Sequence, residues 1–260
     1  MQQTPVFNLW TYRFFFDCCR LRGMPTHNCQ TLLLFPTAVL RDDIDNCAAL
    51  NRDLATEVER IRASSAGVKR TNRGGWHSSP DLQTLGNPVF NAIINHIRAR
   101  LGVWVDANFE LSQTPDATLW DIKLWANVNQ RGDFNVGHNH FATGVVASGV
   151  YYVRCGGPEA GGATVFFNDR ARWLLANSPV VLKSSVYPVI PQDGALLIFP
   201  SWLSHEVKPY LGNEKRITLA FNAGHPSVPV KSEHDQPRLE RLKNWLRRRY
   251  WSLCRRFERQ

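Results

Sequence analysis

The sequence predicts a mainly β fold, a β-sandwich or barrel with flanking helices. Short strand-like runs recur between residues 119 and 222, and turns rich in Gly, Pro and Asn separate them. Amphipathic helical segments precede these runs, and a basic helical segment follows them. The chain has 260 residues, of which 43% are hydrophobic. This size and composition favour one sizeable domain with small appendages and exclude a disordered chain.

The helical part begins after a short apolar run at residues 32–36, which predicts an opening strand. Residues 42–62 have helical spacing of apolar side chains, and the acidic pair Asp42 and Asp43 suits a helix start. A second amphipathic helix is predicted over residues 87–101, with Gly102 ending it. Between the two helices lies a Gly-rich loop, in which Trp76, His77 and Ser78 form a candidate lid.

The β part follows as a series of short apolar runs. Strands are predicted at residues 119–127, 144–153, 164–167, 184–188, 195–199 and 217–222. The sequence contains no run of about 18 apolar residues, so it predicts no membrane-spanning helix.

The net charge of +9 is concentrated at the end of the chain. Residues 238–260 hold nine basic and two acidic residues, a net charge of +7, which leaves +2 for residues 1–237. Leucines recur there at helical spacing, so we expect a basic amphipathic helix. Its apolar stripe can dock on the domain, or its cations can attract an anionic membrane surface, nucleic acid or an acidic partner.

The six cysteines indicate reduced thiols in a cytoplasmic protein. They stand at positions 18, 19, 29, 47, 155 and 254 and form no Cys-x-x-Cys pair, so neither a zinc cage nor a disulfide scaffold is indicated. Residues 1–23 lack the long apolar run and cleavage site of a signal peptide. We hypothesise that Met24 is the native start.

Three histidines in the β region are candidate metal ligands. His138 and His140 are two residues apart, so on a strand they project from the same face. His205 lies far along the chain, and a β fold can bring it opposite the pair. Imidazole is a ligand for iron, zinc, copper or nickel, and solvent-facing or hydrogen-bonded loop histidines are the alternative.

Arg216 is a candidate anion-binding residue, because it begins the strand that follows His205. An Arg directed into a barrel needs a carboxylate partner, and its planar fork suits a diacid. Thr218, two residues later, shares its face and can add a hydroxyl hydrogen bond.

Several motifs in fixed order resemble the Fe(II)/2-oxoglutarate-dependent oxygenase superfamily. They are His138-Asn139-His140, Ser148-Gly149-Val150-Tyr151-Tyr152-Val153, Gly161-Gly162-Ala163-Thr164, Pro191-Gln192-Asp193-Gly194, His205-Glu206-Val207 and Arg216-Ile217-Thr218. The sequence is most similar to the prolyl-hydroxylase-like branch and, within it, to a bacterial and phage group with a Gly-Gly-Trp-His-Ser loop, as at residues 74–78. The resemblance covers roughly residues 30–225.

The resemblance implies a double-stranded β-helix core, also called a jelly roll or cupin-like fold, that uses Fe(II), 2-oxoglutarate and O2. His138 and His205 then match metal ligands, and Arg216 matches the residue that binds the distal carboxylate of 2-oxoglutarate. His140 stands where the superfamily has a carboxylate ligand. The iron is therefore held either by three histidines or by His138 and His205 with water.

Further residues are expected near the cosubstrate. The resemblance makes Asn127 a candidate for a polar contact, and Trp125 shares its strand face; the alternative is that Trp125 packs in the core and Asn127 caps a turn. Tyr151 and Tyr152 are expected on opposite faces of their strand, so only one lines the pocket, and we assign Tyr151 to it.

The resemblance implies a dioxygenase that hydroxylates an unactivated C–H bond of an amino acid, a peptide or a small metabolite and releases succinate and CO2. Two alternatives remain: a cupin-like metal-binding or interaction protein without turnover, and a three-histidine dioxygenase that does not use 2-oxoglutarate. The expected organisation is an N-terminal extension at residues 1–30, an oxygenase domain at 31–225 and the basic helix at 226–260.

Overall fold

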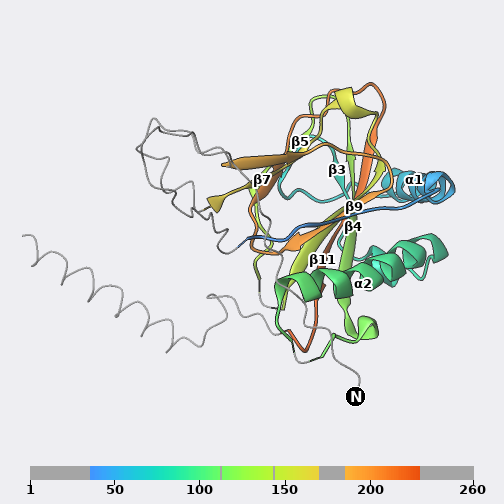
Figure 1. Ribbon diagram of the computed structural model, residues 1–260. Coiled ribbons are helices and arrows are strands. Elements are labelled where there is room, and N and C mark those ends of the chain that lie inside the picture. The colour runs from blue at the N-terminus through green and yellow to red at the C-terminus, as the bar shows by residue number, and fades with distance from the viewer. Residues whose placement is uncertain (1–35, 112, 143, 170–184, 229–260) are drawn as a thin grey trace, which may run out of the picture. The chain divides into compact units, whose positions relative to one another are not determined.

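Two antiparallel sheets form a double-stranded β-helix in the computed structural model (Figure 1), which describes residues 36–111, 113–142, 144–169 and 185–228. The six-stranded sheet has the order β1 (Leu40–Asp43), β9 (Ala195–Pro200), β6 (Ala147–Arg154), β11 (Arg216–Gly224), β4 (Asp121–Asn129) and β3 (Trp76–His77). The five-stranded sheet has the order β2 (Asn72–Arg73), β5 (Phe134–His138), β10 (His205–Val207), β7 (Thr164–Phe167) and β8 (Val186–Val189). The predicted mainly β fold with flanking helices is confirmed.

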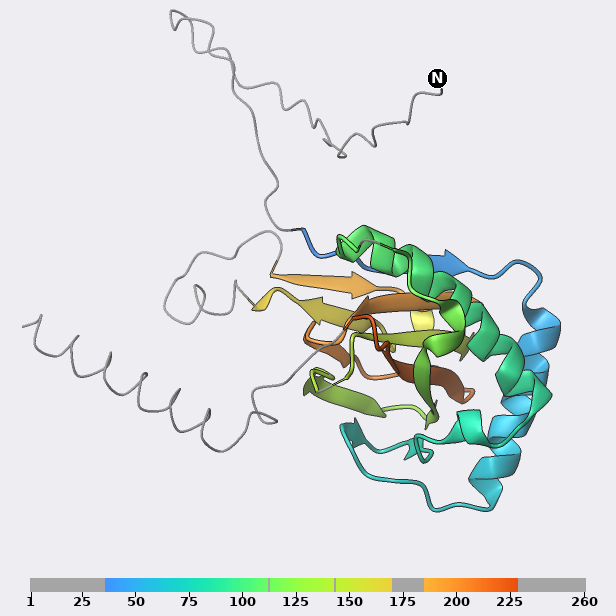
Figure 2. The same ribbon diagram turned by 90° about the horizontal axis from the view of Figure 1, so that it is seen from below.

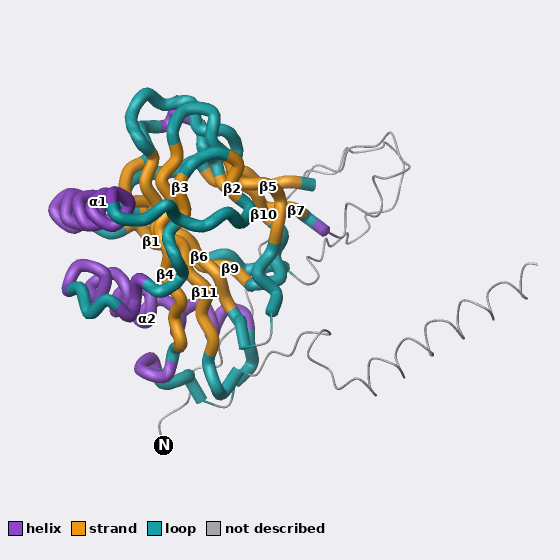
Figure 3. The backbone as a smooth tube through the Cα atoms, turned by 180° about the vertical axis from the view of Figure 1, so that it is seen from behind, coloured by secondary structure: helices purple, strands orange, loops and turns teal. Residues whose placement is uncertain are grey.

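Two helices, α1 (Ala48–Ala63) and α2 (Pro88–Asn108), lie on one side of the larger sheet, as Figures 2 and 3 show from two further directions. The apolar stripes of the helices meet the outward-facing residues of the sheet, so that Leu54, Phe90, Ile97, Leu124 and Leu219 are fully buried in one cluster. Among the described residues, three short 3₁₀ helices lie in connections between the larger elements: Leu82–Thr84, Ala117–Leu119 and Pro158–Ala160. The helices thus leave the inner face of the sheet free for a site.

A second apolar cluster lies inside the barrel. On β9, Leu196 and Ile198 belong to the cluster beneath the helices, whereas Leu197 and Phe199 pack with Tyr152 in the inner cluster. Alternate residues of a strand point to opposite faces, so a strand buried on both faces reads as one apolar run.

Helix α2 does not end at Gly102, and this prediction was wrong. The helix begins as predicted, because the Asn87 side chain accepts a hydrogen bond from the Val89 N–H at 2.9 Å and caps it. It then continues through Gly102 to Asn108. Trp104 and Val105 are buried beyond the glycine, and this packing outweighs the modest preference of Gly against a helix interior.

The predicted helix start at Asp42 and Asp43 was also wrong, because both residues belong to strand β1. This strand pairs with residues of β9. The Asp42 carboxylate accepts hydrogen bonds from His96 at 2.7 Å and Arg100 at 2.9 Å, both on α2. Helix α1 begins later, at Ala48.

The longer predicted strands correspond to observed ones, with ends displaced by a few residues. The run 164–167 coincides with β7, and 195–199 lies within β9. The short strands β1, β2, β3, β5 and β10 were not predicted, because they lack the continuous apolar run that marks β7, a strand of similar length.

Several predictions fall on residues outside the described ranges. They concern Met24, most of the run 32–36 and the basic segment 238–260. Of the described cysteines, Cys47 and Cys155 are free thiols. No helix among the described residues combines the length and apolar character that crossing a membrane requires.

Candidate active site

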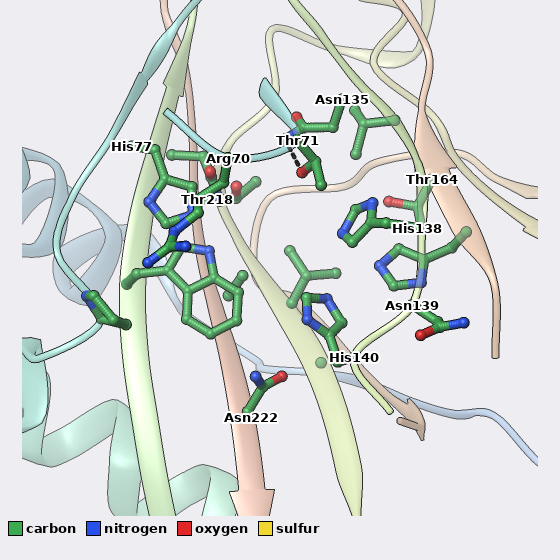
Figure 4. Close-up of a pocket in the computed structure, with 18 of the residues that line it drawn as sticks. Arg70, Thr71, His77, Asn135, His138, Asn139, His140, Thr164, Thr218 and Asn222 are labelled. Atoms are coloured by element: carbon green, nitrogen blue, oxygen red, sulfur yellow. Dashed lines mark hydrogen bonds between the residues drawn. The ribbon is translucent and has the colours of Figure 1, made fainter. Parts of the chain in front are cut away.

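Three histidines converge where the smaller sheet meets the loop after β5. His138 ends β5 and His205 begins β10, and the two are directly paired in the antiparallel register. His140 lies beyond the strand, and its backbone N–H donates to the Ser201 carbonyl at 2.8 Å, which holds this loop in place. The structure therefore brings the three predicted histidines together, although His138 and His140 do not share one strand. Figure 4 shows both in the pocket.

The three rings are close enough to share one ion. Their ring centroids are 4.5 to 5.2 Å apart, and one nitrogen of each ring lies within 4.8 Å of the others. Nδ1 of His138 lies 2.8 Å from the Val136 carbonyl, and Nδ1 of His205 lies 2.9 Å from the Leu203 carbonyl. Since a carbonyl accepts only, Nδ1 carries the proton in both rings and Nε2 keeps its lone pair. This is how metal-binding histidines are commonly oriented.

Burial keeps the three imidazoles neutral. Desolvation, followed by the neighbouring histidines, lowers the pKa of His140 to about 3. Desolvation, followed by the charge of His138, lowers the pKa of His205 to about 4. The pKa of His138 is also lowered by desolvation. All three rings are therefore in the form that binds a metal at neutral pH.

Arg216 is a buried cation without a carboxylate partner among the described residues. Its side chain is 2% exposed. Nη1 donates to Oδ1 of Asn129 at 3.2 Å, and Nε has no hydrogen-bond partner. Gly162 makes room for it, since a Cβ there would lie 2.9 Å from Nε. A buried guanidinium with an orphaned donor fits an anion such as the distal carboxylate of 2-oxoglutarate.

The histidines and Arg216 face one cavity of about 360 Å³, which is also lined by the predicted residues Trp125, Asn127 and Thr218. Thr218 on β11 lies opposite Asn127 on β4 in the register of the two strands. Asn127 therefore lies at the cavity rather than only at a turn.

Tyr151 does not line the cavity, and its assignment was wrong. Its hydroxyl donates to Oδ1 of Asn51 on α1 at 2.7 Å, within the cluster beneath the helices. Tyr152 is the tyrosine that faces inward. Its hydroxyl lies 2.7 Å from Oγ1 of Thr164, and its ring lies 5.6 Å from the Arg216 guanidinium. In the register of β6 and β11, Tyr152 lies opposite Thr218, which lines the cavity, whereas Tyr151 lies opposite Leu219, which is buried beneath the helices.

Only one residue of the candidate lid reaches the cavity. His77 lines it and stacks on Trp125, with ring centroids 5.7 Å apart, and Trp125 in turn lies 5.8 Å from His140. Trp76 instead donates from Nε1 to the Ser65 carbonyl at 2.9 Å. Desolvation lowers the pKa of His77, so this ring is neutral as well.

Sequence reasoning missed several polar residues of the cavity wall, and Arg70, Lys123 and Asn222 are among them. A signal existed for two of them. Lys123 shares its strand face with Trp125, and Asn222 shares its face with Thr218.

Comparison with known proteins agrees with this geometry. Residues 123–222 match the family model described as "Putative 2OG-Fe(II) oxygenase". A search of curated proteins finds no significant match.

Solved structures show the same fold at low sequence identity. A prolyl-4-hydroxylase from Pseudomonas putida has a TM-score of 0.52 and 20% identity, over 73% of this chain and 93% of that one. A prolyl hydroxylase from Trichoplax adhaerens, in complex with a hypoxia-inducible-factor peptide, has a TM-score of 0.51 and 13% identity, over 72% and 83%. The epimerase SnoN from nogalamycin biosynthesis has a TM-score of 0.53 and 12% identity, over 73% and 77%. These structures share the fold of this chain, and the family match shows that residues 123–222 are similar to the 2OG-Fe(II) oxygenases, enzymes that use Fe(II), 2-oxoglutarate and O2.

Proposed function

We propose that this oxygenase hydroxylates an unactivated C–H bond of an amino acid, a peptide or a small metabolite. Fe(II) is held by His138, His140 and His205, and the distal carboxylate of 2-oxoglutarate by Arg216. One observation carries the proposal. Three neutral imidazoles line the same cavity as a buried guanidinium that has no carboxylate partner in the described part of the chain.

The residues of the cavity divide the work. The backbone carbonyls of Val136 and Leu203 orient His138 and His205, so that each offers Nε2. Fe(II) and 2-oxoglutarate, when bound, supply the activation of O2, with one oxygen atom entering the substrate and the other entering succinate as CO2 leaves. Phe199 and Val150 form an apolar part of the cavity wall, which limits the access of water to the site.

Arg216 favours this proposal over a three-histidine dioxygenase that uses no 2-oxoglutarate. Such an enzyme has no use for a buried cation in its pocket, and an unpaired buried charge costs stability. The same argument weighs against an interaction protein that has lost turnover.

Anaerobic reconstitution tests the proposal. Fe(II) is added to the apoprotein, 2-oxoglutarate is titrated while the weak visible charge-transfer band is followed, and succinate is measured after air is admitted. We expect a band and slow succinate formation. Neither should be seen for His138→Ala, whereas His96→Ala, which removes a histidine outside the cavity, should match the wild type. A wild-type protein with no band and no succinate would refute the proposal.

His140→Ala tests the number of ligands. We expect weaker Fe(II) binding and loss of turnover. Unchanged iron affinity would show that only His138 and His205 hold the metal, with water completing the site. Product mass then distinguishes hydroxylation, which adds one oxygen atom to the substrate, from epimerisation, which adds none.

A further inference from the structure

The inward face of β4 and β11 forms a wall with a cation at each end. The strands pair in register, so that Arg216 lies opposite Asn129, Thr218 opposite Asn127 and Asn222 opposite Lys123. Six residues separate Arg216 from Asn222, roughly 20 Å along the strand at about 3.3 Å per residue. A five-carbon diacid held at Arg216 is too short to reach Lys123.

Three residues of the cavity wall other than Arg216 offer unpaired hydrogen-bond donors. Lys123 and Arg70 line the cavity, are exposed to solvent, and have no ion pair among the described residues. Oδ1 of Asn222 accepts a hydrogen bond from Ser148 at 2.8 Å, which leaves Nδ2 free to donate. In Figure 4 the Asn222 side chain lies below His140 in the pocket.

Arg70 is held at the cavity by its own loop. Its backbone N–H donates to Oδ1 of Asn72 at 2.8 Å, and the next residue, Thr71, accepts at its carbonyl from the Val136 N–H at 3.0 Å. The positive charge of Arg70 contributes to the lowered pKa of His77, so the guanidinium lies within electrostatic range of that ring. Figure 4 shows the two residues side by side in the view.

The described part of the cavity wall contains no Asp or Glu. It holds Arg70, Lys123 and Arg216, and the proposed function uses only Arg216. Like-signed charges lining one cleft raise the local concentration of ligands of opposite charge. A cavity of about 360 Å³ is near the small end of ligand pockets, so a bound cosubstrate leaves room for one small substrate group.

We propose that the substrate carries an anionic group, a carboxylate or a phosphate, which binds Lys123, Arg70 and Asn222 while its reacting carbon faces the three histidines. This inference rests on the proposed function, because it concerns the substrate of that same site.

Binding of matched acid and neutral probes tests the inference. The protein is first loaded anaerobically with Fe(II) and 2-oxoglutarate, and the visible band is confirmed. N-acetylglycine and N-acetylglycinamide are then titrated as the carboxylate pair, and glycerol 3-phosphate and glycerol as the phosphate pair, with calorimetry as the readout. We expect the acidic member of at least one pair to bind at least fivefold more tightly, and the pair identifies which anion is preferred. Raised salt should weaken this preference.

Variants locate the anion. Lys123→Met and Arg70→Met should each reduce the preference severalfold, and Lys123→Glu should abolish it. Lys69→Met is the matched control, because Lys69 is an exposed cation next to Arg70 that does not line the cavity; it should leave the preference unchanged.

Three results would overturn the inference. They are equal affinity within both pairs, a preference that persists in the Arg70→Met/Lys123→Met double variant, and no binding of any probe by protein that shows the band. Absence of the band in the wild type would instead overturn the proposed function, so the two failures are distinguishable.

Discussion

Replacing Arg216 with methionine is expected to stabilise the apoprotein while it abolishes 2-oxoglutarate binding. The side chain is 2% exposed and lacks a carboxylate partner among the described residues. Burying one charge costs several kcal/mol. This cost is partly offset, because the hydrogen bond to Asn129 stabilises the buried charge by about 1.5–3 kcal/mol and the contact with the Tyr152 ring by about 0.5–2 kcal/mol. We take the remaining net cost as about 1–3 kcal/mol, so the midpoint of thermal unfolding should rise by roughly 2–12 °C.

The loss of cosubstrate affinity is larger. Two charge-assisted hydrogen bonds to a carboxylate contribute about 1.5–3 kcal/mol each, so their removal should raise Kd at least about 100-fold. Anaerobic thermal unfolding with Fe(II) and increasing 2-oxoglutarate measures both effects. The wild-type midpoint should rise with cosubstrate concentration, because the ligand binds only the folded state, and the midpoint of Arg216→Met should not.

A strand neighbour supplies the control. Arg154 donates from Nε to the Lys215 carbonyl at 2.9 Å and does not line the cavity, so Arg154→Met should leave the response to 2-oxoglutarate intact. An apoprotein of Arg216→Met that melts well below the wild type would show that the guanidinium is already compensated. A variant that still responds fully to 2-oxoglutarate would show that Arg216 is not the anchor.

Three further predictions concern the apoprotein. Its free energy of unfolding in urea should fall as the pH is lowered from about 6.5 towards 4. In the folded protein the pKa values of His140 and His205 are lowered to about 3 and 4, so over this range the unfolded chain binds protons that the folded chain does not. His140→Ala should make this pH dependence weaker, and an unchanged pH dependence would contradict the reasoning. Gly102→Ala should raise the free energy of unfolding by up to about 1 kcal/mol, because Gly102 lies within helix α2 and a Cβ added there would meet no other atom within 4 Å. A lower free energy of unfolding would instead indicate that Gly102 is a left-handed helix cap. Gly149→Ala should lower the free energy of unfolding by about 1–3 kcal/mol in the same urea assay, because the added Cβ would overlap the Phe221 ring. An unchanged midpoint of urea unfolding would show that β6 and β11 can move apart without cost.

The residues that carry the proposed chemistry could be chosen from the sequence, but their placement could not. Spacing suggested that His138 and His140 share a strand face, whereas the structure brings them together at a strand end, with a hydrogen bond to Ser201 holding the loop. Arg216 is predicted from its place at the start of the strand after His205 and from the family resemblance, and the structure places it at the cavity. Alternation also predicted that Tyr151 and Tyr152 would separate, but not which of them faces the cavity.

The failures in the fold share one cause, which is that tertiary contacts outweigh local signals. Gly102 is a reasonable helix end until Trp104 and Val105 gain a buried position beyond it. Asp42 and Asp43 have the residue types of a helix start, but pairing with β9 places them in a strand, and Arg100 of α2 donates a hydrogen bond to Asp42. Such partners lie more than 50 residues away in the sequence, where periodicity carries no information.

In the proposed site, His140 takes the place of a carboxylate ligand, and this would change the charge that the pocket presents to its substrate. Three neutral imidazoles add nothing to the +2 of Fe(II), and Arg216 adds +1, while 2-oxoglutarate brings −2. The loaded site then has a net charge of +1, where a carboxylate ligand would leave it neutral. Arg70 and Lys123 add to this excess, and no carboxylate on the described wall reduces it. A cavity with this surplus would repel cationic substrates and favour an anionic one, so the proposed His140 ligand and the two unpaired cations point to the same substrate class.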